Sequence, residues 1–389
     1  MNMNEPKLRF KADDGSQFPD WEKKPFGDVV SEFKVKTKVE DEDTLLSCAI
    51  NGVFLNSELF GHQRGQSNVG YLKIKKGTLI LSAQNLHLGN ANVNMRFEHG
   101  MISPAYKTYN IVGCCVEYMN QWVKRDITKQ FFYNATTVGA SGCRRNVDWE
   151  MLYSQLFAVP SLPEQQKIAE FLSTIDTVIA KQKETVSAWE ERKKGMMQKL
   201  FSQEVRFKAD DGSDFPEWEE KKLGDVCEYR KGQSVGVNYV GTENMNQNFS
   251  GVDSLDSTNE VKGVTYCVGD TLMSNIRPYL KKTWKADRNG VCSTDVLVFR
   301  PVNVDSDFLY YNISSEKFVL YVMTGVKGSK MPRGDKGHIM EYDMLTPCLE
   351  EQQKIADCLS SLDEVIEKQK ATLAAWEELK KGLLQQMFV

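Results

Sequence analysis

Apolar residues recur at alternating steps of four and three over two long stretches of the chain. The seam positions are Ile168, Leu172, Ile175, Ile179, Gln182, Val186, Trp189, Lys193, Met196 and Leu200 in the first stretch, and Ile355, Leu359, Leu362, Ile366, Gln369, Leu373, Trp376, Lys380, Leu383 and Met387 in the second. Such steps are typical of a heptad seam, along which one helix packs against another. The pattern therefore predicts two long helices, over 163–201 and 350–389.

The start and the end of these helices have their own signals. Pro163 and Glu164 suit a first helical turn, where proline is tolerated and an acidic group is favoured. Gly195 and Gly382 each follow a Lys-Lys pair and offer an earlier end, because lysine before glycine is also a stop signal. The unbroken series of steps favours helices that continue through both glycines.

Each seam offers the other a matching partner, so we expect the two helices to pair antiparallel. Gln182 and Gln369 lie near the centres of their segments and would meet at a pseudo-twofold axis. A polar residue at a seam position can fix the register of two helices, although the two glutamines could also simply face solvent. The same geometry predicts two further contacts, Trp189 with Leu362 and Trp376 with Ile175.

The chain is one unit written twice. Residues 9–29 agree with 206–226 at about 16 of 21 positions, and 164–201 agree with 351–388 at about 24 of 38, which places the two copies 197 and 187 residues apart. In each copy these repeated segments form a frame, and the filling between them, 30–163 in copy one and 227–350 in copy two, has diverged. A shared frame around different fillings suggests one partner bound twice and two ligands read once each. The predicted domains are 1–162, 163–201, 202–217 (a linker), 218–349 and 350–389.

The two fillings predict α+β heads that share a fold. Gly77–Ser82 parallels Gly269–Ser274, and Gly100–Ser103 parallels Gly290–Ser293. After the first of these turn-and-strand segments the polar residues differ between the copies. Head one has Gln84 and Asn85, and head two has Asn275 and Arg277. Amide and guanidinium groups are those that make bidentate contacts to adenine and guanine edges, so these residues are candidate DNA contacts.

Charge gives partial support for a nucleic-acid partner. The chain has a net charge of −4, which argues against a free-standing, tight DNA binder. The heads are locally basic, however, and a glycine-rich loop over 324–339 could bring cations close to phosphates. A run of charges can also be only a solvated face. The cationic candidates for DNA binding are Arg144, Arg145, Lys281, Lys282, Lys327, Lys330, Arg333 and Lys336.

No enzyme constellation is found. The sequence has no GxxxxGK[ST] loop and no dinucleotide fingerprint, and its four histidines do not have zinc-ligand spacing. We therefore predict no catalytic residue and no metal site in this chain. No apolar run is long enough for a membrane span, no signal peptide is visible and the nine cysteines form no CxxC pair. The expectation is a soluble, cytoplasmic protein of a bacterium or an archaeon.

The repeated helix start Glu-Gln-Gln-Lys-Ile-Ala, at 164–169 and 351–356, follows a divergent head in both copies. This layout resembles the specificity subunit of type I restriction-modification systems over essentially the whole chain. The resemblance implies two target-recognition domains that each read one half of a split, asymmetric site in double-stranded DNA. It also implies an antiparallel coiled coil that docks two adenine-methyltransferase subunits, through which restriction subunits join.

The resemblance places S-adenosylmethionine, ATP and magnesium on the partner subunits, with no cofactor in this chain. The sequence thus predicts a non-catalytic DNA-recognition and assembly subunit. An alternative from another class is a coiled-coil scaffold whose duplicated heads bind proteins or glycans. Salt separates the two, because DNA binding through several Lys and Arg contacts weakens steeply with ionic strength.

Overall fold

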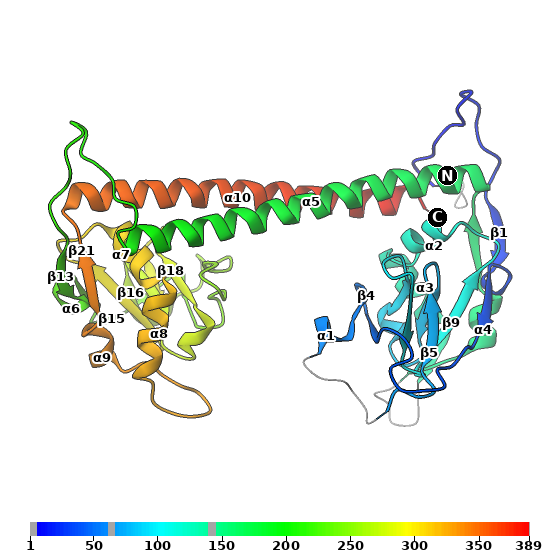
Figure 1. Cartoon of the computed structure of the whole chain (residues 1–389), viewed down its shortest axis with the longest axis horizontal. Coiled ribbons are helices and arrows are strands. Elements are labelled where there is room, and N and C mark those ends of the chain that lie inside the picture. Colours follow the sequence, from blue (N-terminus) through cyan, green and yellow to red (C-terminus); the bar gives the residue numbers. More distant parts are fainter. Residues whose placement is uncertain (1–5, 61–66, 139–144, 389) are drawn as a thin grey trace. The chain divides into compact units, whose positions relative to one another are not determined.

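The computed structural model describes residues 6–60, 67–138 and 145–388. The chain divides into two compact units, each formed by one head and by parts of both long helices. Unit 1 comprises Met1–Lys183 and Ala371–Val389, and unit 2 comprises Glu184–Lys370. Figure 1 labels many of the helices and strands of both units.

Head one is built on a four-stranded antiparallel sheet in the order β2-β9-β6-β7. Three two-stranded sheets, β1-β12, β3-β4 and β5-β8, lie beside it, and β10 pairs with β11. The strands are β1 Glu22–Pro25, β2 Val30–Phe33, β3 Leu46–Ala49, β4 Gly52–Leu55, β5 Leu72–Lys75, β6 Leu79–Ser82, β7 Ala91–Val93, β8 His99–Ile102, β9 Tyr106–Ile111, β10 Thr136–Val138, β11 Arg145–Val147 and β12 Leu156–Val159. The helices are η1 Phe26–Asp28, α1 Asn56–Leu59, η2 Leu86–Leu88, α2 Val116–Trp122, α3 Asp126–Asn134 and α4 Trp149–Ser154.

Head two has an equivalent sheet in the order β14-β20-β17-β18, with the pair β13-β21 and the sheet β15-β16-β19. The strands are β13 Glu219–Lys222, β14 Cys227–Tyr229, β15 Gln233–Gly236, β16 Val261–Tyr266, β17 Thr271–Ser274, β18 Thr283–Lys285, β19 Gly290–Cys292, β20 Val296–Pro301 and β21 Asp343–Thr346. The helices are α6 Leu223–Val226, η3 Pro278–Leu280, α7 Ser306–Ile313, α8 Glu316–Thr324 and α9 Lys336–Met340.

The prediction of one shared head fold is confirmed. The parallel segments form equivalent strands, since β6 and β17 occupy the same place in the two four-stranded sheets. Each of these strands follows a glycine with positive φ, Gly77 at 84° and Gly269 at 86°. Only glycine adopts this backbone conformation without steric cost, so the turn before the strand explains why glycine stands at both positions. The diverged fillings therefore keep the residues that fix the sheet.

The two long helices form as predicted. Helix α5 covers Leu162–Phe201 and α10 covers Leu349–Gln386, so both continue through Gly195 and Gly382. A Cβ atom at either glycine would meet no atom within 4 Å. None of the seam residues is exposed. Burial of the stripe against a partner thus outweighs the low helix propensity of glycine.

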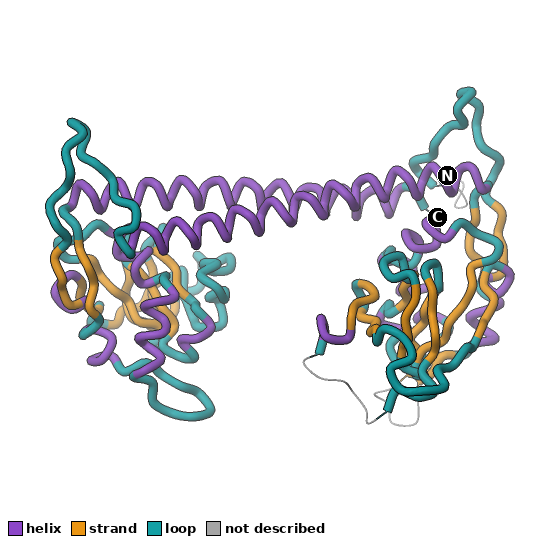
Figure 2. The backbone as a smooth tube through the Cα atoms, in the orientation of Figure 1, coloured by secondary structure: helices purple, strands orange, loops and turns teal. Residues whose placement is uncertain are grey.

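The two helices pack together in antiparallel fashion, as the ion pairs inside each unit show. In unit 1, Lys183 Nζ lies 2.8 Å from Glu377 Oε1, and Lys380 pairs with Asp176. The partner number on α10 rises from 377 to 380 as the number on α5 falls from 183 to 176. Figure 2 shows helical backbone along the whole of both segments, in contrast to the strand-rich heads.

Unit 2 repeats this arrangement with the equivalent residues. Lys370 Nζ lies 3.0 Å from Glu190 Oε1, and Lys193 Nζ lies 2.5 Å from Asp363 Oδ1. The internal pseudo-symmetry of the sequence is therefore carried into the ion pairs along the seam. The predicted fold class, two β-rich heads on an antiparallel pair of long helices, is confirmed.

Each head is fixed to the start of one long helix by a buried carboxylate. Glu164 is fully buried and receives Arg9 Nε at 3.0 Å, Arg9 Nη2 at 2.8 Å and Trp21 Nε1 at 3.2 Å. A buried carboxylate requires partners of this kind, because burial without them is costly. This contact explains why the peptide around Trp21 and the Glu-Gln-Gln-Lys start are the repeated parts of the sequence.

The second copy makes the same clamp. Arg206 Nε lies 3.1 Å from Glu351 Oε1, Arg206 Nη2 lies 2.9 Å from Glu351 Oε2, and Trp218 Nε1 lies 2.9 Å from the same oxygen. The segment 202–217, interpreted from the sequence as a linker, thus holds an arginine that binds the start of α10.

The end of the other helix closes each head. In unit 1 the Phe388 ring packs 5.2 Å from the Tyr118 ring, centroid to centroid, and in unit 2 Phe201 packs 5.8 Å from Phe308. The backbone N–H of Leu8 also donates to Gln386 O at 2.9 Å. Both units therefore depend on helix ends that come from opposite halves of the sequence.

Candidate nucleic-acid interface

In head two, the loop between β17 and β18 meets the glycine-rich loop that the sequence singled out. The backbone N–H of Arg277 donates to Pro332 O at 2.8 Å, and that of Gly334 donates to Asn275 O at 3.3 Å. The segment 327–333 folds back on itself, since Lys327 and Arg333 exchange two backbone hydrogen bonds of 2.9 Å. Two sets of predicted DNA contacts, far apart in the sequence, therefore lie on one surface.

The β17–β18 loop is held in an uncommon backbone conformation. Arg277 has φ 51° and Lys281 has φ 55°, on either side of the short helix η3. A side chain in this left-handed region costs free energy, and such residues persist only where the surroundings fix them. Asn248 and Phe249 supply part of that support by donating their backbone N–H groups to Leu280 O and Lys281 O at 3.1 and 2.7 Å.

The Arg277 side chain is exposed, and within the described part of the chain it makes no hydrogen bond or ion pair. Tyr279, two residues on, is 47% exposed, and Met331 in the facing loop is 49% exposed. Sequence reasoning missed Tyr279 and Met331 as parts of this surface. The signal for Tyr279 was the Arg-Pro-Tyr turn directly after a predicted strand.

Asn275, predicted to contact a base edge, is buried in the structure, and its contact to DNA stays a prediction. The residue is 7% exposed, and its Oδ1 atom is buried without a hydrogen-bond partner in the described residues. Gly334 lies against it, because a Cβ atom there would come within 3.0 Å of Asn275 Oδ1. Close packing against the backbone of the facing loop, which no sequence pattern reveals, turns this amide inward.

Two predicted cations of the same loop are bound within the head. Lys281 Nζ lies 2.5 Å from Glu316 Oε1, and Lys282 Nζ donates to Thr242 O at 2.7 Å. These contacts tie the loop to α8 and to residue 242. The structure thus gives both lysines a role in positioning the loop, and a DNA contact from either stays a prediction.

The four cations predicted in the glycine-rich loop are all exposed, but they are not alike. Lys327 pairs with Asp335, and Arg333 Nη2 lies 3.1 Å from Asp295 Oδ1. Within the described residues, Lys330 and Lys336 have no ion pair or side-chain hydrogen bond. Two of the four predicted cations are thus paired within the head and two are available, and a DNA contact from any of them stays a prediction.

Asp335 also has a structural role in this loop. Its side chain caps α9 by accepting the backbone N–H groups of Gly337 and His338 at 2.9 and 3.0 Å. The hydrogen bond from Lys327, together with these N–H groups, lowers the pKa of Asp335 to about 2. The carboxylate therefore stays ionised at neutral pH and fixes the base of the loop.

Head one presents a different surface at the equivalent strand end. Gln84 and Asn85 are both exposed in the turn after β6. Arg145 donates from Nε and Nη2 to Thr136 Oγ1 and Thr136 O, both at 2.7 Å, and its guanidinium lies 4.0 Å from the Tyr133 ring centroid. The predicted contact Arg144 lies outside the described residues.

The predicted helix-pairing residues differ in burial. Ile175 is buried, and Trp376 packs against the core cluster that contains it. Trp189 and Trp376 are half-buried. Leu362 packs against the core of unit 2, and the contact of Trp189 with Leu362 stays a prediction. The same holds for the meeting of Gln182 with Gln369, which belong to different units.

Comparisons with known proteins agree with this architecture. Residues 216–375 match the family model described as the type I restriction modification DNA specificity domain. The chain is 26% identical over 282 residues to the type I restriction enzyme MjaVIII specificity subunit of Methanocaldococcus jannaschii, covering 66% of each chain. It is 24% identical over 361 residues to the putative MjaX specificity subunit of the same organism, covering 84% of this chain and 76% of that protein.

Solved structures show the same fold. A type I restriction-modification S subunit from M. genitalium matches with a TM-score of 0.55 at 14% identity, covering 99% of both chains. A chain from a study of complex assembly and conformational transition of the type I R-M system matches with a TM-score of 0.53 at 16% identity, covering 95% of this chain and 98% of that one.

All these matches fall in one class, the specificity proteins of restriction-modification systems. Within this class the chain is similar to the type I restriction-modification specificity subunits, and residues 216–375 match their DNA specificity domain, in agreement with the resemblance. Over the residues described, no helix is both long and apolar enough to cross a membrane.

Proposed function

We propose that the chain is the non-catalytic DNA-recognition and assembly subunit of a type I restriction-modification system. Each head reads one half of a bipartite, asymmetric site in double-stranded DNA, and the paired helices dock two adenine-methyltransferase subunits. The observation that carries this proposal is the contrast between the two copies. Their clamps and helix ion pairs are the same, while the loops at the equivalent strand ends differ in chemistry.

Different loops on one sheet suit the reading of two different sequences. Head two offers Arg277 from a rigid, strained loop, and a guanidinium held in this way suits the O6 and N7 atoms of guanine. Head one offers the amides of Gln84 and Asn85, which suit adenine. The sheet and its buried core set the position of each loop, so the loop chemistry changes without a change of fold.

The neighbouring cations suit contacts to the DNA backbone. Lys330 and Lys336 are exposed and have no carboxylate partner among the described residues, so both are available to phosphates. Phosphate contacts position a protein on the duplex but carry no sequence information. Arg333 would have to give up its ion pair with Asp295 to bind a phosphate, so it should contribute less to DNA affinity than an unpaired cation.

The shared frame suits a partner that is bound twice. In this proposal the methyltransferase subunits bind S-adenosylmethionine and carry the restriction subunits with their ATP and magnesium, and this chain supplies recognition and spacing. The methylation and ATP-dependent steps are assigned to other subunits, because the sequence of this chain has no nucleotide-binding or methyltransferase motif.

Co-expression of the chain with the methyltransferase encoded beside it, followed by mapping of methyladenine across the host genome, tests the proposal. We expect methylation at one bipartite sequence. Replacement of residues 227–350 by the head of a relative should change one half of that sequence and leave the other half unchanged. Absence of sequence-specific methylation, or a change in both halves after the exchange, would contradict the proposed division of labour.

A further inference from the structure

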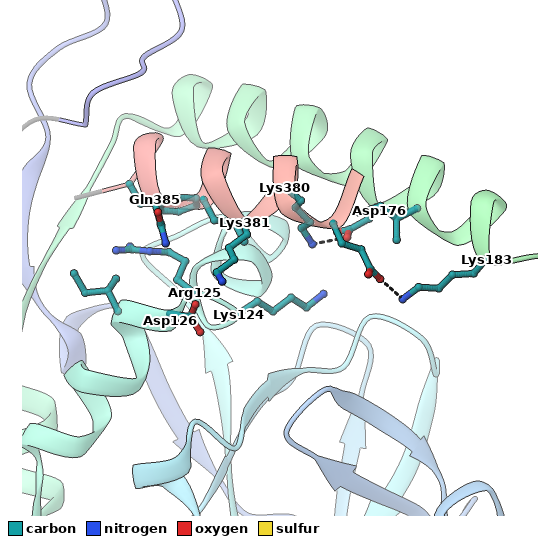
Figure 3. Close-up of a pocket in the computed structure, with 13 residues that line it drawn as sticks. Lys124, Arg125, Asp126, Asp176, Lys183, Lys380, Lys381 and Gln385 are labelled. Atoms are coloured by element: carbon teal, nitrogen blue, oxygen red, sulfur yellow. Dashed lines mark hydrogen bonds and ion pairs between the residues drawn. The ribbon is translucent and has the colours of Figure 1, made fainter. Parts of the chain in front are cut away.

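Unit 1 contains a pocket of 680 Å³ between the paired helices and the turn that joins α2 to α3. The head contributes Lys124, Arg125, Asp126 and Ile127, and the rest of the lining comes from α5, α10 and Phe388. Figure 3 shows Lys124, Arg125 and Lys381 around the same space.

The lining of this pocket recurs in unit 2. A larger pocket of 1450 Å³ there is lined by the equivalent residue at every position of the first, together with additional residues of head two. The turn between α7 and α8 takes the place of the α2–α3 turn, with Ser314 and Ser315 where head one has Lys124 and Arg125.

The two linings are alike where the helices form them and unlike where the heads do. Of the helix and helix-end residues that line the first pocket, only Leu384 differs from its counterpart, which is Met197. The head residues 124–127 share no identity with their counterparts 314–317. Because the helices as a whole agree at only about 24 of 38 positions, this lining is more alike than its surroundings.

Intramolecular packing accounts for part of this identity but not for all of it. The ion pairs of Lys183 and Lys380, and their counterparts, explain those residues. Lys381 and its counterpart Lys194 are both exposed, and neither makes an ion pair or a side-chain hydrogen bond in the part of the chain that is described. Lys381 helps to lower the pKa of Asp126, after the larger effect of Lys129, but it forms no ion pair with it. A lysine kept at the rim of both pockets without an ion pair points to a partner outside the chain.

The floor of both pockets is apolar. Ile179 and Ile366 are buried at equivalent positions, and Leu384 or Met197 lies beside them, half-buried. A groove with an apolar floor and a lysine at its rim is complementary to an amphipathic segment that carries a carboxylate.

We infer that these two pockets are equivalent docking sites for one acid-bearing amphipathic segment, presented once by each of two copies of the same partner protein. Lys381 in unit 1 and Lys194 in unit 2 pair with the carboxylate of that segment. The inference rests on the proposed function for the identity of the partner, the methyltransferase subunit. It adds where each copy binds and which side chains recognise it.

Charge reversal at the two lysines, one at a time, tests the inference. With the full-length chain and the purified methyltransferase, Lys194→Glu should weaken one of two binding events by about 10-fold at low salt and leave the other unchanged. Lys381→Glu should do the same for the other event, and the double variant should weaken both. Native mass measurement at a partner concentration between the two dissociation constants should show one partner per chain for either single variant.

Lys23→Glu is the matched control, because it reverses an exposed lysine of the frame at a position where copy two already has Glu220. It should leave both binding events unchanged. Lys194→Gln, which removes the charge without adding repulsion from nearby glutamates, should act in the same direction as Lys194→Glu with a smaller effect. Circular dichroism should confirm that each variant folds.

The outcomes separate this inference from the proposed function. Failure of the unaltered chain to bind two methyltransferase copies would contradict the proposed function itself. Normal binding of two copies by the double variant would overturn only the docking sites. A loss of affinity for a DNA duplex by the chain alone, with partner binding intact, would show that the pockets contact the DNA backbone and would also overturn the inference.

Discussion

Removal of the buried carboxylate Glu164 should loosen one unit of the molecule and spare the other. The substitution Glu164→Ala leaves the Arg9 guanidinium, whose side chain is 15% exposed, without the carboxylate that binds it at 2.8 and 3.0 Å. It also leaves the Trp21 indole N–H without its acceptor. Loss of one partner of a buried pair costs about 3–5 kcal/mol, and the partial exposure of Arg9 places the expected cost near about 3 kcal/mol.

This cost should be measured locally, because a protein of two units need not unfold in one transition. Hydrogen exchange followed by mass spectrometry reports the amides at the start of α5 and of α10 separately. A cost of about 3 kcal/mol corresponds to about 100-fold faster exchange where opening limits it. We expect this change at 162–172 in Glu164→Ala, and at 349–359 in Glu351→Ala.

An exposed ion pair of the same peptide provides the control. Asp13 pairs with Lys167 at 2.5 Å, but its side chain is 95% exposed, so Asp13→Ala should change stability by less than about 1 kcal/mol. Exchange in Glu164→Ala that stays within a few-fold of the unaltered chain would refute the reasoning. Equal acceleration at both helix starts would refute the independence of the two clamps.

Three further predictions concern the seam, its acid sensitivity and the DNA surface. Trp376→Ala should cost about 1–3 kcal/mol in urea unfolding, less than a fully buried tryptophan, because the side chain is only half-buried; an unchanged midpoint would count against the packed seam. Burial raises the pKa of Asp176, but the hydrogen bonds from Lys380 and Gln121 outweigh this effect and lower the pKa overall. The stability that Asp176 contributes is therefore present above about pH 4, and it is lost as the pH falls through the pKa of the folded state. Asp176→Asn should therefore flatten the acid limb of the stability curve, and an identical limb in both proteins would contradict this. Arg277→Ala should relax the specificity at one base position at a cost of about 1–3 kcal/mol in binding free energy. Lys330→Ala should weaken binding to all duplexes alike and lower the slope of affinity against salt concentration by about one. Equal effects of the two variants on all sequences would refute a base contact by Arg277 and a phosphate contact by Lys330.

The sequence by itself determined the long helices, their pairing and the duplication. A seam with steps of four and three has one stable solution, burial against a second seam, so the helices and their continuation through Gly195 and Gly382 followed from local spacing. The shared sheet of the heads was also visible, because the turn before β6 and the turn before β17 need glycine at positive φ. These features depend on residues close together in the chain.

Only the tertiary structure decided which predicted DNA contacts reach the surface. Asn275 and Arg277 are two residues apart, yet the Asn275 amide packs against Gly334 and the Arg277 side chain is exposed. The difference arises from a loop about 60 residues further on, whose backbone binds both residues.

The same holds for the charges. Lys281 and Arg333 looked available in the sequence, and their carboxylate partners Glu316 and Asp295 lie 35 and 38 residues away. The correspondence of the two pockets likewise needs both long helices, because Lys381 and Ile179 come from opposite halves of the chain. Contacts between distant segments depend on how the chain closes on itself, and hydrophobic periodicity carries no information about them.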